Sequence, residues 1–244
     1  MALNFSLDSL LEQSLLTDDP WWVYILWGAG WTIGLAVTAF ALALVVGVVV
    51  GTLRTTRNRF VAGLCEAWIE LFRNIPLIVQ IFIWYFVVPE LVPWYKDWLT
   101  EADPAVGQFV TAFLCMGLFT SSRIAEQVRS GIASIPRGLP NAARALGFTP
   151  LQSYCEVILP MAMRLIVPPL TSEAMNLIKN TAVAMTIGLP ELTMRANEMG
   201  ENTFTFFAAY LWATILYIVI ALVVNRLMVW VESQCAIPGL IAAK

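Results

Sequence analysis

The amino-acid sequence predicts an all-α, polytopic membrane protein with five transmembrane helices. Of its 244 residues, 59% are hydrophobic and only 13% are charged, and the mean hydropathy is +0.74. A soluble domain has roughly 45–50% apolar and about 25% charged residues. A soluble fold would have to expose much of the apolar excess, which excludes the soluble class. The length accommodates about five or six spans of ~20 residues.

Five long apolar segments provide the expected spans, and they cover about residues 22–53, 60–88, 106–124, 165–189 and 204–231. Together they form an expected membrane domain over residues 22–235, followed by a cytoplasmic tail over residues 236–244. Residues 1–21 contain four acidic and no basic residues. A secretory signal begins with a basic region, so we expect this N-terminal segment to lie at the membrane surface on the periplasmic side.

The distribution of Lys and Arg among the loops predicts the orientation. Residues 54–59 contain three arginines, and residues 125–164 contain four, whereas the loops on the opposite side contain only Lys96 and Arg195. Basic loops stay in the cytoplasm. We therefore expect a periplasmic N-terminus and a cytoplasmic C-terminus.

Several residue types that catalysis or metal binding would need are missing. The chain has no His, no GxxxxGK[ST] string and no CxxC pattern among its four cysteines. The lack of His argues against an intramembrane serine protease, and the lack of a P-loop excludes an ATPase of that class in this chain. We expect no catalytic residue and no metal site, and the net charge of −3 gives no reason to expect nucleic acid.

Two features of the spans have more than one interpretation. The glycine pairs Gly30/Gly34 and Gly47/Gly51 either allow close helix contacts or are the ordinary composition of a membrane helix. Pro76 must break or kink the second span. The break either exposes backbone groups to a substrate or is a packing kink.

Charged residues at membrane depth form the candidate site, because such residues usually face a cavity or an opposite charge. Three cations fall in different spans, namely Arg73, Arg123 and Lys179. One interpretation pairs Arg73 with Glu70 and Arg123 with Glu126 on their own helices. Lys179 has no such partner on its helix.

Residues 137–160 predict two helices joined by a tight turn on the cytoplasmic side. Pro140 to Leu146 favour a short helix, Gly147 is placed to end it, and Thr149-Pro150 are typical of the cap and first position of a second short helix. Such a unit is suited to contact a cytosolic partner.

This loop resembles the EAA loop of ABC importer permeases, EAA-x3-G-x9-I-x-L-P. The spacing agrees throughout, and the matching residues are Ala142, Ala143, Gly147, Leu159 and Pro160. Asn141 replaces the Glu of the motif and Val157 replaces the Ile. The exchange of Glu for Asn removes a charge, and with it any ion pair that the Glu makes.

The resemblance covers residues 22–235 and is strongest to the polar amino-acid permeases, in particular those of glutamate/aspartate importers. Residues 70–80, 122–129 and 176–181 are similar to segments of that subfamily. The resemblance implies a type I importer permease fold in the bacterial inner membrane. It also implies a second permease (a paralogue or a copy of this chain), two ATPases that carry the ATP and Mg²⁺, a periplasmic binding protein and an amino-acid substrate.

The ATPase-coupling residues that the resemblance implies are Asn141, Ala142, Ala143, Ala145, Leu146, Gly147 and Phe148. The chain itself is expected to contain no cofactor. Two alternatives remain: a permease for glutamine, asparagine or another polar amino acid, and a membrane scaffold that transports nothing.

An acidic amino acid inside a membrane protein requires fixed cations, since an unpaired buried charge is unfavourable. Arg73, Arg123 and Lys179 are the candidates for its carboxylates. The other expected substrate-binding residues are Asn74, Asn180 and, for the ammonium group, Glu173. If Glu70 and Glu126 instead satisfy the two arginines, a neutral substrate such as glutamine is expected.

Overall fold

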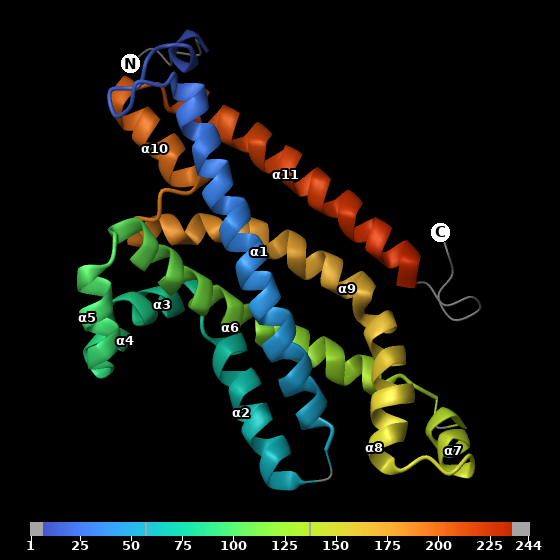
Figure 1. Cartoon of the computed structure of the whole chain (residues 1–244). Helices are drawn as coiled ribbons and strands as arrows, with labels where there is room; N and C mark the ends of the chain where they lie inside the picture. Colours follow the sequence, from blue (N-terminus) through green and yellow to red (C-terminus); the bar gives the residue numbers. More distant parts are fainter. Residues whose placement is uncertain (1–6, 57, 137, 236–244) are drawn as a thin grey trace. The chain divides into compact units, whose positions relative to one another are not determined.

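The structure, a computed structural model, describes residues 7–56, 58–136 and 138–235. In these residues no strand occurs, and the one β-bridge joins Gln13 and Pro20. The longest helices are α1 (Trp21–Arg54), α2 (Arg59–Asn74), α6 (Pro104–Ala133), α9 (Leu159–Asn180) and α11 (Phe206–Cys235) (Figure 1). Arg57, Arg137 and the expected tail over residues 236–244 lie outside the described residues.

Shorter elements connect these helices. They are η1 (Asp8–Leu10), α3 (Leu77–Phe82), η2 (Ile83–Val87), α4 (Val88–Leu91), α5 (Pro93–Glu101), α7 (Gly138–Ala145), α8 (Pro150–Gln152), η3 (Ser153–Ile158), η4 (Thr181–Ile187) and α10 (Leu192–Thr203).

Four helical stretches are long and apolar enough to cross a membrane: Trp21–Arg54, Pro104–Ala133, Pro150–Ile187 and Phe206–Cys235. The helices Arg59–Asn74 and Leu77–Leu91 form a fifth span if the bent pair is counted as one. The expected all-α membrane fold with five spans is therefore confirmed.

The expected break at Pro76 is present. α2 ends at Asn74, Ile75 and Pro76 have extended backbone with ψ of 130° and 138°, and α3 begins at Leu77. Proline has no N–H to donate and disfavours the helical conformation of the residue before it. The two effects end α2 and leave its last residues, Arg73 and Asn74, at a helix terminus.

The helix after the loop differs from the expectation. Thr149 caps α8 in a capping box with Gln152, but α8 is not a separate short helix, because it continues through the π-helical turn η3 into α9. The helix thus begins at Pro150, whereas the apolar segment was expected to begin near residue 165. Pro168 and Pro169 lie inside α9 and do not end it.

The chain forms two compact units, each assembled from three segments. The first unit comprises Met1–Phe40, Pro76–Gly117 and Met175–Val224, and the second comprises Ala41–Ile75, Leu118–Ala174 and Asn225–Lys244. The divisions fall within α1, α6, α9 and α11, and between α2 and α3.

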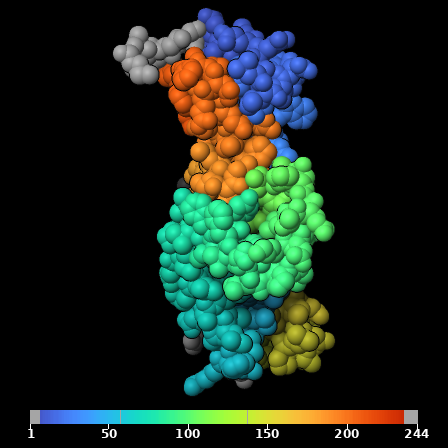
Figure 2. All heavy atoms as spheres, turned by 90° about the vertical axis from the view of Figure 1, so that its left-hand side faces the viewer, coloured from blue at the N-terminus to red at the C-terminus, as the bar shows by residue number. Residues whose placement is uncertain are grey.

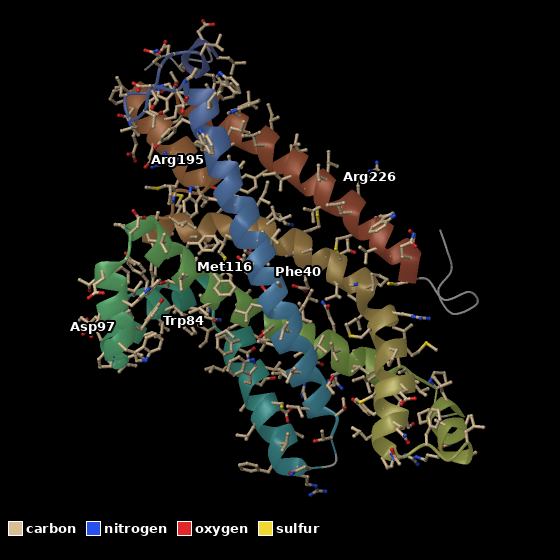
Figure 3. The ribbon with its side chains drawn as sticks, viewed as in Figure 1. Phe40, Trp84, Asp97, Met116, Arg195 and Arg226 are labelled. Atoms are coloured by element: carbon tan, nitrogen blue, oxygen red, sulfur yellow. The ribbon has the colours of Figure 1, made fainter. Side chains whose placement is uncertain are left out.

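In the first unit, the start of α1 packs with α10 and the first part of α11 (Figure 1). Trp21, Ile25, Leu192 and Met199 are almost completely buried there. The Tyr24 hydroxyl donates to Glu198 at 2.6 Å. The Arg195 guanidinium lies 4.1 Å from the centre of the Tyr24 ring, on the side of α10 that faces α1 (Figure 3). These polar contacts fix the register of α10 against α1.

Glu191 is a buried acid outside the apolar spans, and it has structural partners. Its side chain caps α10 by accepting from the Met194 amide at 2.9 Å, and it also accepts from the Tyr217 hydroxyl at 2.8 Å. Burial raises the pKa of this carboxyl, against the opposing effect of these hydrogen bonds. The contacts hold α10 against α11.

Also in the first unit, α5 lies against the beginning of α6, and Figure 2 shows the two as one green mass of atoms. The buried Tyr95 hydroxyl lies 2.8 Å from the Thr111 hydroxyl. Lys96 forms an exposed ion pair with Glu90 at 2.7 Å.

In the second unit, Gly47 and Gly51 allow α1 to approach α6 closely. A Cβ atom at Gly51 would lie 2.5 Å from the Ala125 carbonyl oxygen, and one at Gly47 would lie 2.7 Å from Ile124. This pair therefore makes the close contact that its spacing allows. The other pair, Gly30 and Gly34, makes no such close helix contact with the described residues. A Cβ atom at Gly30 would meet nothing within 4 Å, and one at Gly34 would meet only Phe109, at 3.9 Å.

Candidate functional site

A cluster of four charged residues joins three helices of the second unit. Arg54, the last residue of α1, contacts Glu66 of α2 at 2.9 Å and also pairs with Glu126 of α6. Arg129, one turn further along α6, donates to the same Glu126 carboxylate at 2.5 and 3.0 Å. Glu126 is thus shared by two arginines, and its negative charge is fully compensated.

This cluster changes the pairing expected for the two candidate arginines. The interpretation that pairs Arg123 with Glu126 is wrong, because Arg54 and Arg129 occupy Glu126. The pair between Arg73 and Glu70, which belongs to the same interpretation, is also absent from the described structure, in which Glu70 instead accepts from the side-chain amide of Asn74 at 2.5 Å. Neither arginine is satisfied by an acid on its own helix.

Four of the six expected substrate-binding residues line one hollow of the second unit. The hollow has a volume of about 500 Å³, within the usual range of small-molecule sites. Its lining consists of Arg73, Asn74, Arg123, Glu126, Gln127, Ser130 and Glu173. Because α2 ends at Asn74, both of its contributing side chains lie at the break in the second span.

Arg123 is held in the hollow by weak contacts. Its guanidinium lies 5.1 Å from the centre of the Phe119 ring, one turn earlier on α6, and 3.9 Å separates it from the Glu173 carboxylate. That distance is too long for a hydrogen bond. The Glu173 side chain is mostly buried and accepts instead from Gln127 at 3.2 Å.

Two polar atoms in this hollow are buried without a hydrogen-bond partner among the described residues, namely Nε of Arg123 and Oε1 of Gln127. Buried polar atoms are normally satisfied, so such atoms need an explanation. One is a donor and the other an acceptor. A carboxylate and an ammonium group are the kinds of partner that these two atoms lack.

The sequence did not single out Gln127. The sequence does contain an indication of its role: Gln127 follows Arg123 by four residues and therefore lies on the same face of α6. Lys179 and Asn180, the other two expected residues, belong to the first unit at the end of α9. Lys179 is exposed, and no ion pair joins it to a described residue.

The turn between α7 and α8 has the local structure that its sequence predicts. α7 ends at Ala145, Gly147 has φ of +84°, and the Thr149 side chain caps the next helix. Ala143 is buried, whereas Leu146 has 78% of its surface exposed. The other expected coupling residues, Asn141, Ala142, Ala145 and Gly147, are exposed and Phe148 is half-buried. The turn thus presents an apolar tip.

The described residues contain no group of three or more His, Cys, Asp or Glu that could hold a metal ion. The charged side chains of the hollow are suited to bind a zwitterionic or anionic molecule, and they offer no arrangement of nucleophile and base.

Together, the five helical spans and the helix–turn–helix loop define a polytopic membrane protein of the transport class. Residues 43–235 match the family described as "Binding-protein-dependent transport system inner membrane component". The chain belongs to this family. It is a multi-pass inner-membrane transport subunit and not an enzyme.

Individual relatives agree with this assignment. The chain is 41% identical over 249 residues to the Glutamate/aspartate import permease protein GltJ of Escherichia coli (strain K12), with 100% of each chain covered. It is 29% identical over 214 residues to the Glutamate/aspartate import permease protein GltK of Escherichia coli O6:H1, with 87% of this chain and 94% of that protein covered.

A solved structure of an amino acid ABC transporter with histidines has the same fold. Its TM-score is 0.75 with 24% identity, and the match covers 87% of this chain and 94% of that chain. The expected type I importer permease fold is therefore confirmed.

The turn at Gly147 gives the first prediction. Replacing Gly147 with Val forces a β-branched residue to adopt φ of +84°, which costs about 1–2 kcal/mol or more. We expect ATPase co-purification and substrate-stimulated ATP hydrolysis to fall while membrane insertion is retained. Gly138→Val is the matched control, since Gly138 lies in α7 and a Cβ atom there meets nothing within 4 Å. Full stimulation in Gly147→Val would show that this turn does not transmit the coupling.

Proposed function

We propose that this chain is a permease subunit of an ATP-driven importer whose substrates are the acidic amino acids glutamate and aspartate. The observation that carries the proposal is the hollow in which no described carboxylate lies within hydrogen-bonding distance of Arg73 or Arg123. The full-length similarity to a glutamate/aspartate import permease supports the same substrate class.

The charges of the hollow favour an anion. Glu126 is compensated by Arg54 and Arg129, so Glu173 is the one acid in the lining that is left to oppose Arg73 and Arg123. Arginine can bind a carboxylate through two parallel hydrogen bonds. In our proposal the two arginines and Asn74 bind the carboxylates of the substrate, and Glu173 and Gln127 accept from its ammonium group.

Lys179 and Asn180 remain proposed substrate-binding residues on a separate helix. A substrate that crosses the membrane must be released from one set of contacts to reach another. We propose that these two residues act at a different stage of transport from the arginines of the hollow.

The partners follow from the same proposal. Two glutamate/aspartate import permeases of Escherichia coli O6:H1 match this chain, at 41% and 29% identity. This favours pairing with a paralogous permease over pairing with a second copy. Two ATPases would bind the loops around Leu146 and Gly147, and a periplasmic protein would deliver the amino acid.

The orientation can be tested by labelling. If the loops around residues 54–59 and 125–164 are cytoplasmic, a cysteine at Thr100 should react with an impermeant maleimide in intact spheroplasts. A cysteine at Ser134 should react only after permeabilisation. Both positions are exposed, and both variants are made in a background without the four native cysteines. The reverse labelling pattern would overturn the proposed orientation.

Uptake by proteoliposomes that contain the complete transporter tests the substrate. The unsubstituted complex should import glutamate and aspartate. In Arg123→Gln, loss of a charged hydrogen bond worth about 1.5–3 kcal/mol should raise the KM for glutamate roughly tenfold or more. Arg226→Gln is the control, because Arg226 is an exposed arginine of α11 in the same unit (Figure 3).

The double variant Arg123→Gln/Glu173→Gln tests whether Arg123 binds the substrate or only neutralises the charge of Glu173. If Arg123 serves only to neutralise Glu173, removing both charges should restore uptake, and the proposal that Arg123 binds substrate is then wrong. If Arg123 and Glu173 both bind the substrate, as proposed, uptake stays low. An unsubstituted complex that imports glutamine and ignores glutamate and aspartate would overturn the acidic-substrate proposal.

A further inference from the structure

The two oxygens of the Glu126 carboxylate bind two different arginines of the second unit. Arg129 makes both of its contacts with Oε1, at 2.5 and 3.0 Å, whereas Arg54 pairs with Oε2. Arg129 belongs to α6, the helix of Glu126 itself, but Arg54 is the last residue of α1. A movement of the end of α1 against α6 would therefore free Oε2 and leave Oε1 occupied.

Arg123 is the cation to which a freed Oε2 would turn. It precedes Glu126 by three residues on α6, a spacing at which helical side chains are neighbours, and both residues line the same hollow. No described carboxylate lies within hydrogen-bonding distance of Arg123, since 3.9 Å separates it from Glu173. Arg54 thus keeps Glu126 away from an arginine that we propose for the substrate.

The end of α1 is in turn connected to the loop that we assign to the ATPases. The hydroxyl of Thr55, the residue after Arg54, lies 2.5 Å from the Tyr154 hydroxyl of η3. Because the Thr55 hydroxyl donates to the Thr52 carbonyl at 2.8 Å, the Tyr154 hydroxyl is the donor of this contact. α7 packs against η3. A displacement of α7 can therefore reach Arg54 through the hydrogen bond to its neighbour Thr55.

We propose that Arg54 is a positioning residue that controls the affinity of the hollow for its substrate. In the described structure it holds Glu126 and leaves Arg123 to a substrate carboxylate. When the ATPases move the loop, Tyr154 displaces the end of α1, Oε2 of Glu126 accepts from Arg123, and the substrate loses this partner. This inference rests on the proposed function, because it assigns a regulator to the same site.

The exchange of partners leaves no charge uncompensated, which matters because an unpaired buried charge is unfavourable. Arg54 retains the carboxylate of Glu66, which it contacts at 2.9 Å, and Glu126 retains Arg129. Arg123 exchanges one carboxylate, that of the substrate, for another.

Uptake kinetics of the complete transporter in proteoliposomes test the inference. In Arg54→Gln, Glu126 is free to bind Arg123, so we expect the KM for glutamate to rise about fivefold or more, a usual coupling between two sites. The double variant Arg54→Gln/Glu126→Gln should restore the KM, because no carboxylate then competes for Arg123. Glu66→Gln is the matched control, since it removes the other contact of Arg54 and leaves Glu126 with both arginines. Its KM should not change.

A third variant separates this competition from a loss of stability. In Arg54→Gln/Arg123→Gln, the arginine that Glu126 would bind is absent, so the KM should equal that of Arg123→Gln alone. A further rise of the KM in this variant would overturn the inference. So would an unchanged KM in Arg54→Gln, or no recovery in Arg54→Gln/Glu126→Gln.

Tyr154→Phe tests the connection to the loop, because it removes the donor hydroxyl and keeps the ring. With the hollow intact, we expect the KM for glutamate to stay the same while the maximal rate of uptake falls. Thr55→Val/Tyr154→Phe should lower the rate no further, since the two hydroxyls form one contact. Additive losses would show that this contact is not the connection. All these outcomes compare variants, so they can fail while glutamate import by the unsubstituted complex, the test of the proposed function, still stands.

Discussion

The pairing of Glu126 with two arginines is the interaction on which the proposed site depends. A charge at membrane depth is unfavourable unless an opposite charge or a polar cavity meets it. Arg54 and Arg129 both use the one carboxylate of Glu126, and this removes the acid that would otherwise neutralise Arg123. The cluster therefore joins α1 to α6 and at the same time leaves a cation of the hollow available to a substrate.

The backbone contributes to the same site through the break in the second span. Because Pro76 cannot continue the hydrogen bonding of α2, Arg73 and Asn74 lie at a helix end. Gly47 and Gly51 bring α1 against α6, which places Arg54 within reach of Glu126. Each of these features is a local property of the chain, and together they determine which charges are compensated.

The features of the fold that depend on local chemistry could be predicted from the sequence. The apolar composition of α1 and α11, the break at Pro76 and the cap at Thr149 each follow from neighbouring residues. The start of the fourth long helix at Pro150 could not be predicted from hydropathy, because Glu156, Pro160 and Arg164 interrupt the apolar residues between Pro150 and the expected start near residue 165.

The residues of the candidate site could be predicted from the sequence, but the ion pairs between them could not. Arg73, Asn74, Arg123 and Glu173 were expected as a set and share one hollow. Arg54 and Glu126 are 72 positions apart, so nothing in the local pattern indicates that they pair. Helical spacing alone favours an ion pair between Arg123 and Glu126. The contact between α1 and α6 instead brings Arg54 to Glu126. Gln127 is a candidate substrate-binding residue because its buried Oε1 has no hydrogen-bond partner among the described residues, which only the structure shows.

The most direct test of the proposed site is an electron cryo-microscopy structure of the complete transporter. The complex would be trapped with its glutamate-loaded binding protein and with ATPases that bind nucleotide without hydrolysing it. The proposed site requires density for the amino acid in the hollow, with a carboxylate at Nε of Arg123 and the ammonium group at Oε1 of Gln127. Glutamate bound elsewhere in the transporter, in a map that shows this hollow without it, would contradict the assignment.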